Sequence, residues 1–209
     1  MKSVFKISVL TVAIAAVSIF STPAIAGSAY ESSFSAPLTS PVKLDIRLSE
    51  DMAYRAENLP KKLSDRGGSS RLNSGFGNNG YYGEKDLSQL QDRLRKRLTE
   101  RFDKAGLVID ENASMTLVVT IEDAKPNRPT FKQLSKEPSL SFKSFGTGGA
   151  EVTGELIDAA GNSLGTADYS WFETNIRDAQ FGSTWSDAHR AFRSFAKKIG
   201  KDLAQQPNI

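Results

Sequence analysis

The sequence of 209 residues contains no cysteine, which excludes disulfide bonds and thiolate metal sites. Histidine is also scarce, because His189 is alone and a typical zinc site would need further ligands. No G-x-S-x-G, H-E-x-x-H or G-x-x-x-x-G-K pattern is present. These absences give no support for a metal, a cofactor or a catalytic nucleophile. We therefore expect a protein that uses no cofactor and is not an enzyme.

Long apolar runs are scarce as well. A basic start is followed by an apolar stretch at 7–20 and by the small-residue site Ala24-Ile25-Ala26. This order is typical of a secretory signal, and the stretch is shorter than the ~20 residues that span a bilayer. We predict a signal peptide at 1–26 that is cleaved after Ala26, and a periplasmic location, with secretion as the alternative. An uncleaved membrane anchor is the competing interpretation.

Charge of neither sign dominates. The chain has 27 basic and 24 acidic residues, for a net charge of +3. Removal of residues 1–26 takes away two lysines and no acidic residue, so 25 basic and 24 acidic residues remain, a net charge of +1. This balance gives no case for nucleic acid as a ligand. The expected partner is an envelope protein or a cell-surface component, with at most peripheral membrane contact, and the oligomeric state stays open.

The mature chain has the pattern of one α+β domain at 42–204, preceded by a Ser-, Ala- and Pro-rich segment at 27–41 that we expect to be a flexible lead-in. Alternation of apolar and polar residues predicts the strands. They lie at 42–48, 114–123, 139–145, 151–157 and 164–174. The last two strands are expected to form a hairpin, and the segment at 139–145 a short edge strand.

Two amphipathic helices are predicted, at 87–105 and 185–203. Leucines at every third or fourth position form the apolar face of the first helix, and Trp185, Phe192 and Phe195 lie on that of the second. The order of strands and helices predicts an α+β fold, in which a mostly antiparallel sheet is covered on one face by the two amphipathic helices.

A loop at 64–83 is rich in Gly, Ser and Asn, and loops this long in a compact domain are usually functional or disordered. Residues 75–80 match G-x-G-x-x-G, but the predicted elements place no strand before them and no helix start within them. A dinucleotide site is therefore not expected. The aromatic residues of this loop either contact a partner or fold back onto the domain. We take Phe76, Tyr81 and Tyr82 as candidate partner-binding residues.

Two basic features complete the set of candidates. Arg128 lies between Pro126 and Pro129, which would present its guanidinium stiffly, although turn formation alone also explains the prolines. The last helix carries a basic stripe that is either a solvated face or a contact for anionic surfaces. The stripe consists of Arg190, Arg193, Lys197 and Lys201.

A recurring pattern covers the segments 148–169 and 184–200, in which a strand ending in Leu-x-Asp-Ala precedes a helix that starts with Trp-x-Asp-Ala. The pattern residues are Leu156, Asp158, Ala159, Trp185, Asp187 and Ala188. Over residues 85–203 the chain resembles a bacterial family of exported envelope lipoproteins and periplasmic proteins of unknown function. The resemblance implies an envelope location and a compact α/β domain, and it implies no chemistry. The chain lacks the lipid-bearing cysteine of many relatives.

These observations predict a non-catalytic periplasmic binding or assembly-accessory protein that acts through the Gly-rich loop. Two alternatives stay open. One is an envelope hydrolase whose carboxylates come from separate loops, and the other is a peripheral binder of anionic membrane through the C-terminal helix.

Overall fold

The structure, a computed structural model, describes residues 29–62, 75–179 and 182–204. The predicted signal peptide and residues 63–74 of the Gly-rich loop lie outside these ranges. In chain order the elements are β1 (Ala29–Ser32), β2 (Val42–Leu48), α1 (Glu50–Tyr54), η2 (Gly75–Asn78), α2 (Glu84–Ala105), β3 (Met115–Lys125), α3 (Phe131–Lys136), β4 (Gly149–Ile157), β5 (Ser163–Phe172), α4 (Ile176–Ala179) and α5 (Ser186–Ala204).

The five strands form one mixed sheet in the order β1-β5-β4-β3-β2. β2 and β3 are parallel, and the other neighbouring pairs are antiparallel. Parallel neighbours need a long crossover connection, and here that connection contains α2. The strands predicted near 42–48 and 114–123, and the predicted hairpin of β4 and β5, are all present in this sheet.

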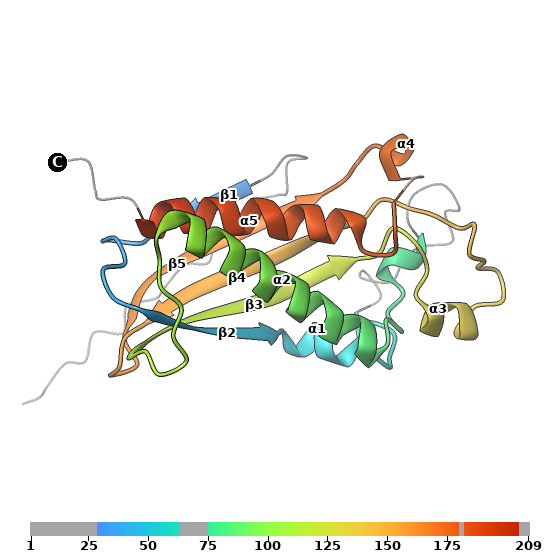
Figure 1. Ribbon diagram of the computed structural model, residues 1–209. Coiled ribbons are helices and arrows are strands. Elements are labelled where there is room, and N and C mark those ends of the chain that lie inside the picture. Colours follow the sequence, from blue (N-terminus) through green and yellow to red (C-terminus); the bar gives the residue numbers. More distant parts are fainter. Residues whose placement is uncertain (1–28, 63–74, 180–181, 205–209) are drawn as a thin grey trace, which may run out of the picture.

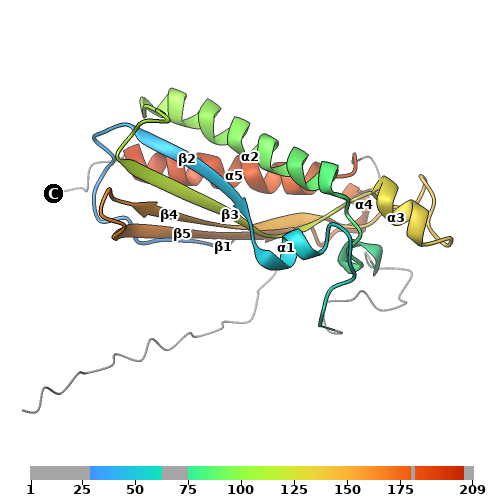
Figure 2. The ribbon, with the colours of Figure 1, turned by 90° about the horizontal axis from the view of Figure 1, so that it is seen from below.

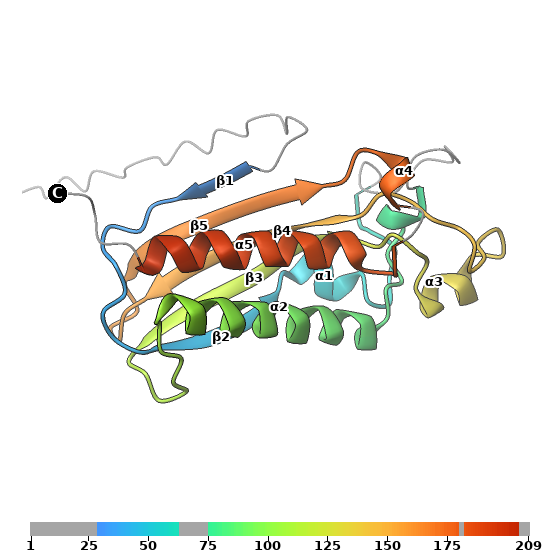
Figure 3. The ribbon, with the colours of Figure 1, turned by 45° about the horizontal axis from the view of Figure 1, so that its top comes forward.

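The two long helices, α2 and α5, lie side by side on one face of the sheet, as Figures 2 and 3 show. The predicted α+β fold, with a mostly antiparallel sheet covered by two amphipathic helices, is confirmed. Leu90, Leu94 and Phe102 of α2 and Phe192 and Phe195 of α5 are fully buried. Each such side chain contributes ~1.5–3 kcal/mol on removal from water, so this layer is the main source of stability.

The segment expected as a flexible lead-in contains a strand. Residues Ala29–Ser32 form β1 and pair with β5 at the edge of the sheet. The Tyr30 hydroxyl donates to Asp202 of α5 at 2.6 Å, and the Tyr30 ring lies 6.5 Å from that of Tyr169. These long-range contacts order the segment, and a local composition rich in Ser, Ala and Pro does not reveal them.

The edge strand predicted at 139–145 is wrong. This segment forms turns between α3 and β4, and Phe142 and Phe145 in it are exposed. Its apolar residues gave the alternation of a strand, but no sheet face covers them. Within the described ranges, no helix is both long enough and apolar enough to cross a membrane.

Candidate functional site

The N-terminal ends of α2 and α5 meet at one end of the sandwich, where the segment that contains α3 also lies (Figure 1). Trp185 directly precedes α5 and donates its Nε1–H to Asp86 in the first turn of α2 at 2.8 Å. The Trp185 ring packs edge-on against Tyr82, with centroids 5.5 Å apart. Because Trp185 and Tyr82 are both buried, these contacts join the two helices and the chain that precedes α2.

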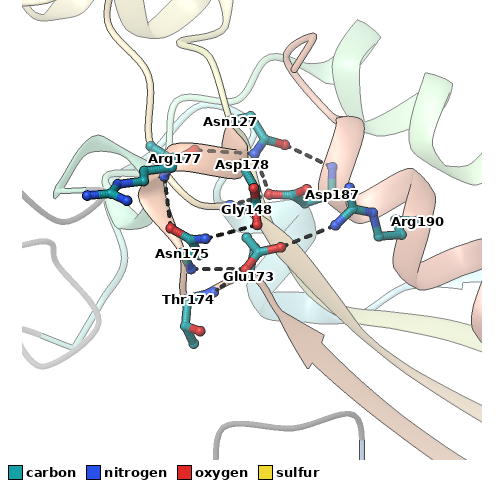
Figure 4. Close-up of polar contacts among 10 residues, drawn as sticks. Asn127, Gly148, Glu173, Thr174, Asn175, Arg177, Asp178, Asp187 and Arg190 are labelled. Atoms are coloured by element: carbon teal, nitrogen blue, oxygen red, sulfur yellow. Dashed lines mark hydrogen bonds and ion pairs between the residues drawn. The ribbon is translucent and has the colours of Figure 1, made fainter. Parts of the chain in front are cut away.

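The connection between β3 and β4, residues 126–148, is held against α5 by a buried polar network (Figure 4). Asn127 donates its side-chain amide to the Asp187 carboxylate, and the Asp187 N–H donates to Asn127 Oδ1 at 2.9 Å. The Gly148 N–H donates to Asp187 Oδ2 at 3.0 Å. Buried polar groups that lose these partners would pay their full desolvation cost. The network therefore fixes both ends of the β3–β4 connection to the first turn of α5.

Within this connection, α3 is attached to residues 75–83 of the Gly-rich loop. Thr130 and Gln133 form a capping box, with both donor–acceptor distances 3.1 Å. The Gln133 side-chain N–H2 donates to the carbonyls of Phe76 at 2.8 Å and Gly80 at 3.0 Å. Gln133 is fully buried, so α3 and the loop before α2 are fixed relative to each other. Sequence reasoning missed α3, because six residues are too few to show helical periodicity.

The aromatic residues of the Gly-rich loop point inward. Tyr82 is fully buried and Phe76 is 8% exposed, and the Tyr82 hydroxyl donates to the Gly77 carbonyl at 2.5 Å. Tyr81 is half-buried, with Lys136 Nζ 5.5 Å from its ring centroid. Of the two interpretations left open by the sequence, folding back onto the domain describes Phe76 and Tyr82. Their rings present no surface to a partner.

Three phenylalanines of the β3–β4 connection lie on the surface instead, and we call Phe131, Phe142 and Phe145 the aromatic surface. Phe131 is 78% exposed and Phe142 is 73% exposed, and their rings meet edge-on with centroids 5.9 Å apart. The guanidinium of Arg128 lies 5.3 Å from the ring centroid of Phe145 and also donates to backbone carbonyls, including that of Lys143. Of the sequence candidates, Arg128 is therefore part of this surface.

A pocket of about 560 Å³ opens beside Phe131 and Phe142. This volume lies within the ~300–1,000 Å³ range of ligand pockets. The first turns of α2 and α5 form its walls, so the contact between Asp86 and Trp185 shapes its interior. Other lining residues are Lys85, Gln89, Arg128 and His189.

Two titratable groups of this pocket have shifted pKa values. Burial raises the pKa of Asp86, and the hydrogen bond from Trp185 partly offsets that rise. The pKa of His189 is lowered to about 4, first by burial and then by the positive charges of nearby arginines. At neutral pH the His189 imidazole is therefore uncharged, and elsewhere in the pocket the Asp86 side chain accepts a hydrogen bond from the Trp185 indole.

The basic stripe lies on the outer face of α5. Arg193, Lys197 and Lys201 are exposed. Arg190 is engaged with β5 and the chain after it, because it donates to Glu173 at 3.2 Å (Figure 4) and lies 5.3 Å from the ring centroid of Trp171. Of the four residues of the predicted stripe, Arg190 is therefore paired with Glu173, whereas the structure gives no such partner for Arg193, Lys197 or Lys201 among the described residues.

Carboxylates that a hydrolase would need meet on the other face of the sheet. Glu155 of β4 and Asp168 of β5 line a hollow of about 200 Å³. Burial raises the pKa of Asp168, and the negative charge of Glu31 adds to this effect. The hollow is smaller than the ~300–1,000 Å³ of typical ligand pockets, so it offers little room for a substrate. In the part of the chain that the structure describes, no group of three or more His, Asp or Glu side chains is placed to hold a metal ion.

No family model matches this sequence, and no curated protein matches it. Weak structural similarity links the chain to a PelC dodecamer from Paraburkholderia phytofirmans, at 14% identity and a TM-score of 0.44 over 87% of this chain and 100% of that chain. A minor lipoprotein from Acinetobacter baumannii matches at 18% identity and a TM-score of 0.29, over 54% of this chain and 84% of that chain. A Xanthomonas campestris protein of the DUF330 family matches at 9% identity and a TM-score of 0.35, over 81% and 85%. The neighbours include a bacterial lipoprotein, but identities and TM-scores this low transfer no function to this chain.

Proposed function

We propose that the protein is an exported, non-catalytic binding or assembly-accessory module of the bacterial envelope, and that it contacts its partner through the aromatic surface and the adjoining pocket. The observation that carries this proposal is the edge-on pair of Phe131 and Phe142 beside a pocket of about 560 Å³. Phe131 is 78% exposed and Phe142 is 73% exposed. Aromatic side chains next to a pocket are typical anchors of protein interfaces. The pair sits on a connection that buried hydrogen bonds hold in place, so little ordering is needed on binding.

The charge around the aromatic surface defines the chemistry of the partner. Residues 125–145 contain five Lys and Arg residues and one Glu, and although Lys132 pairs with Glu57 at 2.5 Å, positive charge predominates around the aromatic surface. A partner that complements this surface carries an apolar side chain that enters the pocket and acidic side chains around it. A segment of an envelope protein supplies both, whereas a flat lipid surface would leave the pocket unfilled.

The export component of the proposal rests on the signal pattern at 1–26 and on the resemblance of residues 85–203. Fractionation of the native host and mass analysis of the mature protein test it. We expect a periplasmic protein that starts at Gly27, because the small-residue site ends at Ala26. A protein that retains residues 1–26 would contradict cleavage and support the anchor interpretation.

The binding component is tested by the double variant Phe131→Ser/Phe142→Ser. We expect it to lose the partner from envelope extracts, because two apolar anchors become polar. The melting temperature should stay nearly unchanged, since both side chains are exposed.

The matched control is Val108→Ser. Val108 is 58% exposed and lies beyond the C-terminal end of α2, far from the pocket. This control should retain the partner, and the complex should weaken as salt is raised, because the charges around the aromatic surface are screened. Full retention of the partner by the double variant would refute the proposed contact surface.

A further inference from the structure

Next to the pocket, neighbouring turns of α2 and α5 both carry arginines. The helices run in the same direction. Trp185 contacts Asp86 near their starts, and a Cβ at Gly200 would lie 3.6 Å from Phe102 near their ends. Residues of α5 therefore lie beside residues of α2 that come about 99 positions earlier in the chain. The turn of α5 that contains His189 is thus next to the turn of α2 that follows Gln89.

Three arginines occupy these neighbouring turns, and we call Arg93, Arg97 and Arg193 the arginine cluster. Arg93 and Arg97 lie one turn apart on α2, and Arg193 follows His189 by one turn on α5. The positive charges of all three act on the imidazole of His189. The cluster therefore surrounds a side chain that also lines the pocket.

The arginine cluster has few acceptors of its own. Arg97 donates to Glu100 at 2.7 Å, but in the described residues the side chains of Arg93 and Arg193 form neither an ion pair nor a hydrogen bond. The Nε atoms of Arg93 and Arg97 are buried and have no acceptor among the described residues. Buried donors in native proteins nearly always have a partner, and an ion or a ligand is one way to supply it.

We propose that the arginine cluster binds a phosphate-type oxyanion. Three guanidinium groups and the carboxylate of Glu100 have a net charge of +2, which is opposite in sign to a phosphate group and close in size to the charge of about −1.5 to −2 that a phosphate monoester carries at neutral pH. One guanidinium group can donate two parallel hydrogen bonds to two oxygens of the same phosphate group. The neutral imidazole of His189 offers a further polar group to the anion. The exposed cation Lys197, one turn from Arg193, raises the local concentration of anions around the arginine cluster.

Two sources supply phosphate oxygens to such a site, inorganic phosphate and the phosphodiester of an anionic phospholipid headgroup, which carries a single negative charge. Binding at the arginine cluster does not depend on the aromatic surface, so the variant Phe131→Ser/Phe142→Ser should retain it. A failure of the proposed partner contact and a failure of this site are therefore distinguishable.

His189 is the single histidine of the chain, so the NMR resonance of its Cε1–H is free of overlap with other histidines and reports on the side chain next to the arginine cluster. Titration of the mature protein with inorganic phosphate at constant ionic strength should shift that resonance until it saturates. Arg93→Gln and Arg193→Gln should each weaken the apparent affinity about tenfold or more. Lys201→Gln removes the same charge two turns further along α5, ~12 Å away, where salt screens its effect. It should keep the affinity within about twofold.

A second arm of the experiment uses vesicles of phosphatidylglycerol, with phosphatidylcholine vesicles as the neutral reference. Binding to phosphatidylglycerol that is lost in Arg93→Gln and kept in Lys201→Gln supports the site and assigns it to lipid headgroups. A saturable response to inorganic phosphate with the same variant pattern supports the site and assigns it to a free anion. No response to either probe overturns the proposal. Equal losses in Lys201→Gln and Arg93→Gln overturn it too, because they would indicate diffuse charge.

Discussion

At the scale of single residues, Trp185 connects the core to the pocket. It is 5% exposed, packs on Tyr82 and donates to Asp86. We predict that Trp185→Ala lowers the free energy of unfolding by about 3–5 kcal/mol, because it leaves a cavity and an Asp86 without its donor. Chemical denaturation measures this change. An unchanged denaturation midpoint would show that the side chain does not contribute to the core.

His189 gives a prediction about pH. Its pKa of about 4 in the folded protein lies below the value of 6.5 expected in the unfolded chain. The unfolded chain therefore binds this proton more readily, so the stability due to neutral His189 is complete above about pH 6.5 and decreases as the pH falls from about 6.5 toward 4.

Glutamine is uncharged at every pH, so the variant His189→Gln should lack the pH-dependent contribution of His189 to the free energy of unfolding. Denaturation of both proteins between pH 7 and pH 4 measures the difference, and carboxylates common to both proteins cancel in it. The stability of the wild type should decrease more steeply than that of the variant. Parallel curves would contradict a burial-driven shift of the His189 pKa.

At the scale of elements, Asp187 holds the β3–β4 connection against α5. Asp187→Asn replaces an acceptor oxygen by a donor next to Asn127 and Gly148. We predict a loss of about 1–3 kcal/mol in unfolding free energy. Amide exchange at Gly148 should become faster, with little change in the centre of β4. The exposed Asp92 gives the control Asp92→Asn, which should change neither quantity. Unchanged exchange at Gly148 in Asp187→Asn would refute the anchoring role.

Most elements could be predicted because their patterns are local. The alternation over Val42–Leu48 and the leucine spacing of α2 are visible in any short window of sequence. β1 was missed because it is ordered by distant partners, Tyr169 and Asp202. The false edge strand near Phe142 shows the opposite error, since apolar alternation also arises in an exposed turn segment.

The candidate site was harder to predict than the fold. Arg128 was proposed as a candidate from its flanking prolines, whereas the outward position of Phe131 and Phe142 leaves no mark in the sequence. Phe76 and Phe131 are both phenylalanines within polar, turn-rich segments, yet one is buried and the other exposed. The amide of Gln133 donates to the backbone carbonyls of Phe76 and Gly80, and such contacts between distant segments can be known only from the fold. The arginine cluster likewise depends on the register between two helices that are distant in sequence.

At the scale of the whole molecule, the two layers carry opposite charge. α2 and α5 together contain 12 Lys and Arg and 7 Asp and Glu residues, a net charge of +5. The five strands contain 3 basic and 7 acidic residues, a net charge of −4. The overall charge is near zero, but the molecule has a positive helical face and a negative sheet. An anionic surface would therefore orient the protein with its helices toward that surface. The segment that contains α3 lies at one end of this sandwich, next to the N-terminal ends of the positively charged helices α2 and α5 (Figure 1).

The most direct test of the central claim places a photo-crosslinking amino acid at position 142 in the protein expressed in its native host. The same residue at position 108, at the far end of α2, is the control. We predict a specific crosslinked product from position 142, formed with an acidic, apolar segment of an envelope protein, and none from position 108. That product should disappear when Phe131→Ser is added. Equal crosslinking from both positions, or none from position 142, would contradict the assignment of partner binding to the aromatic surface.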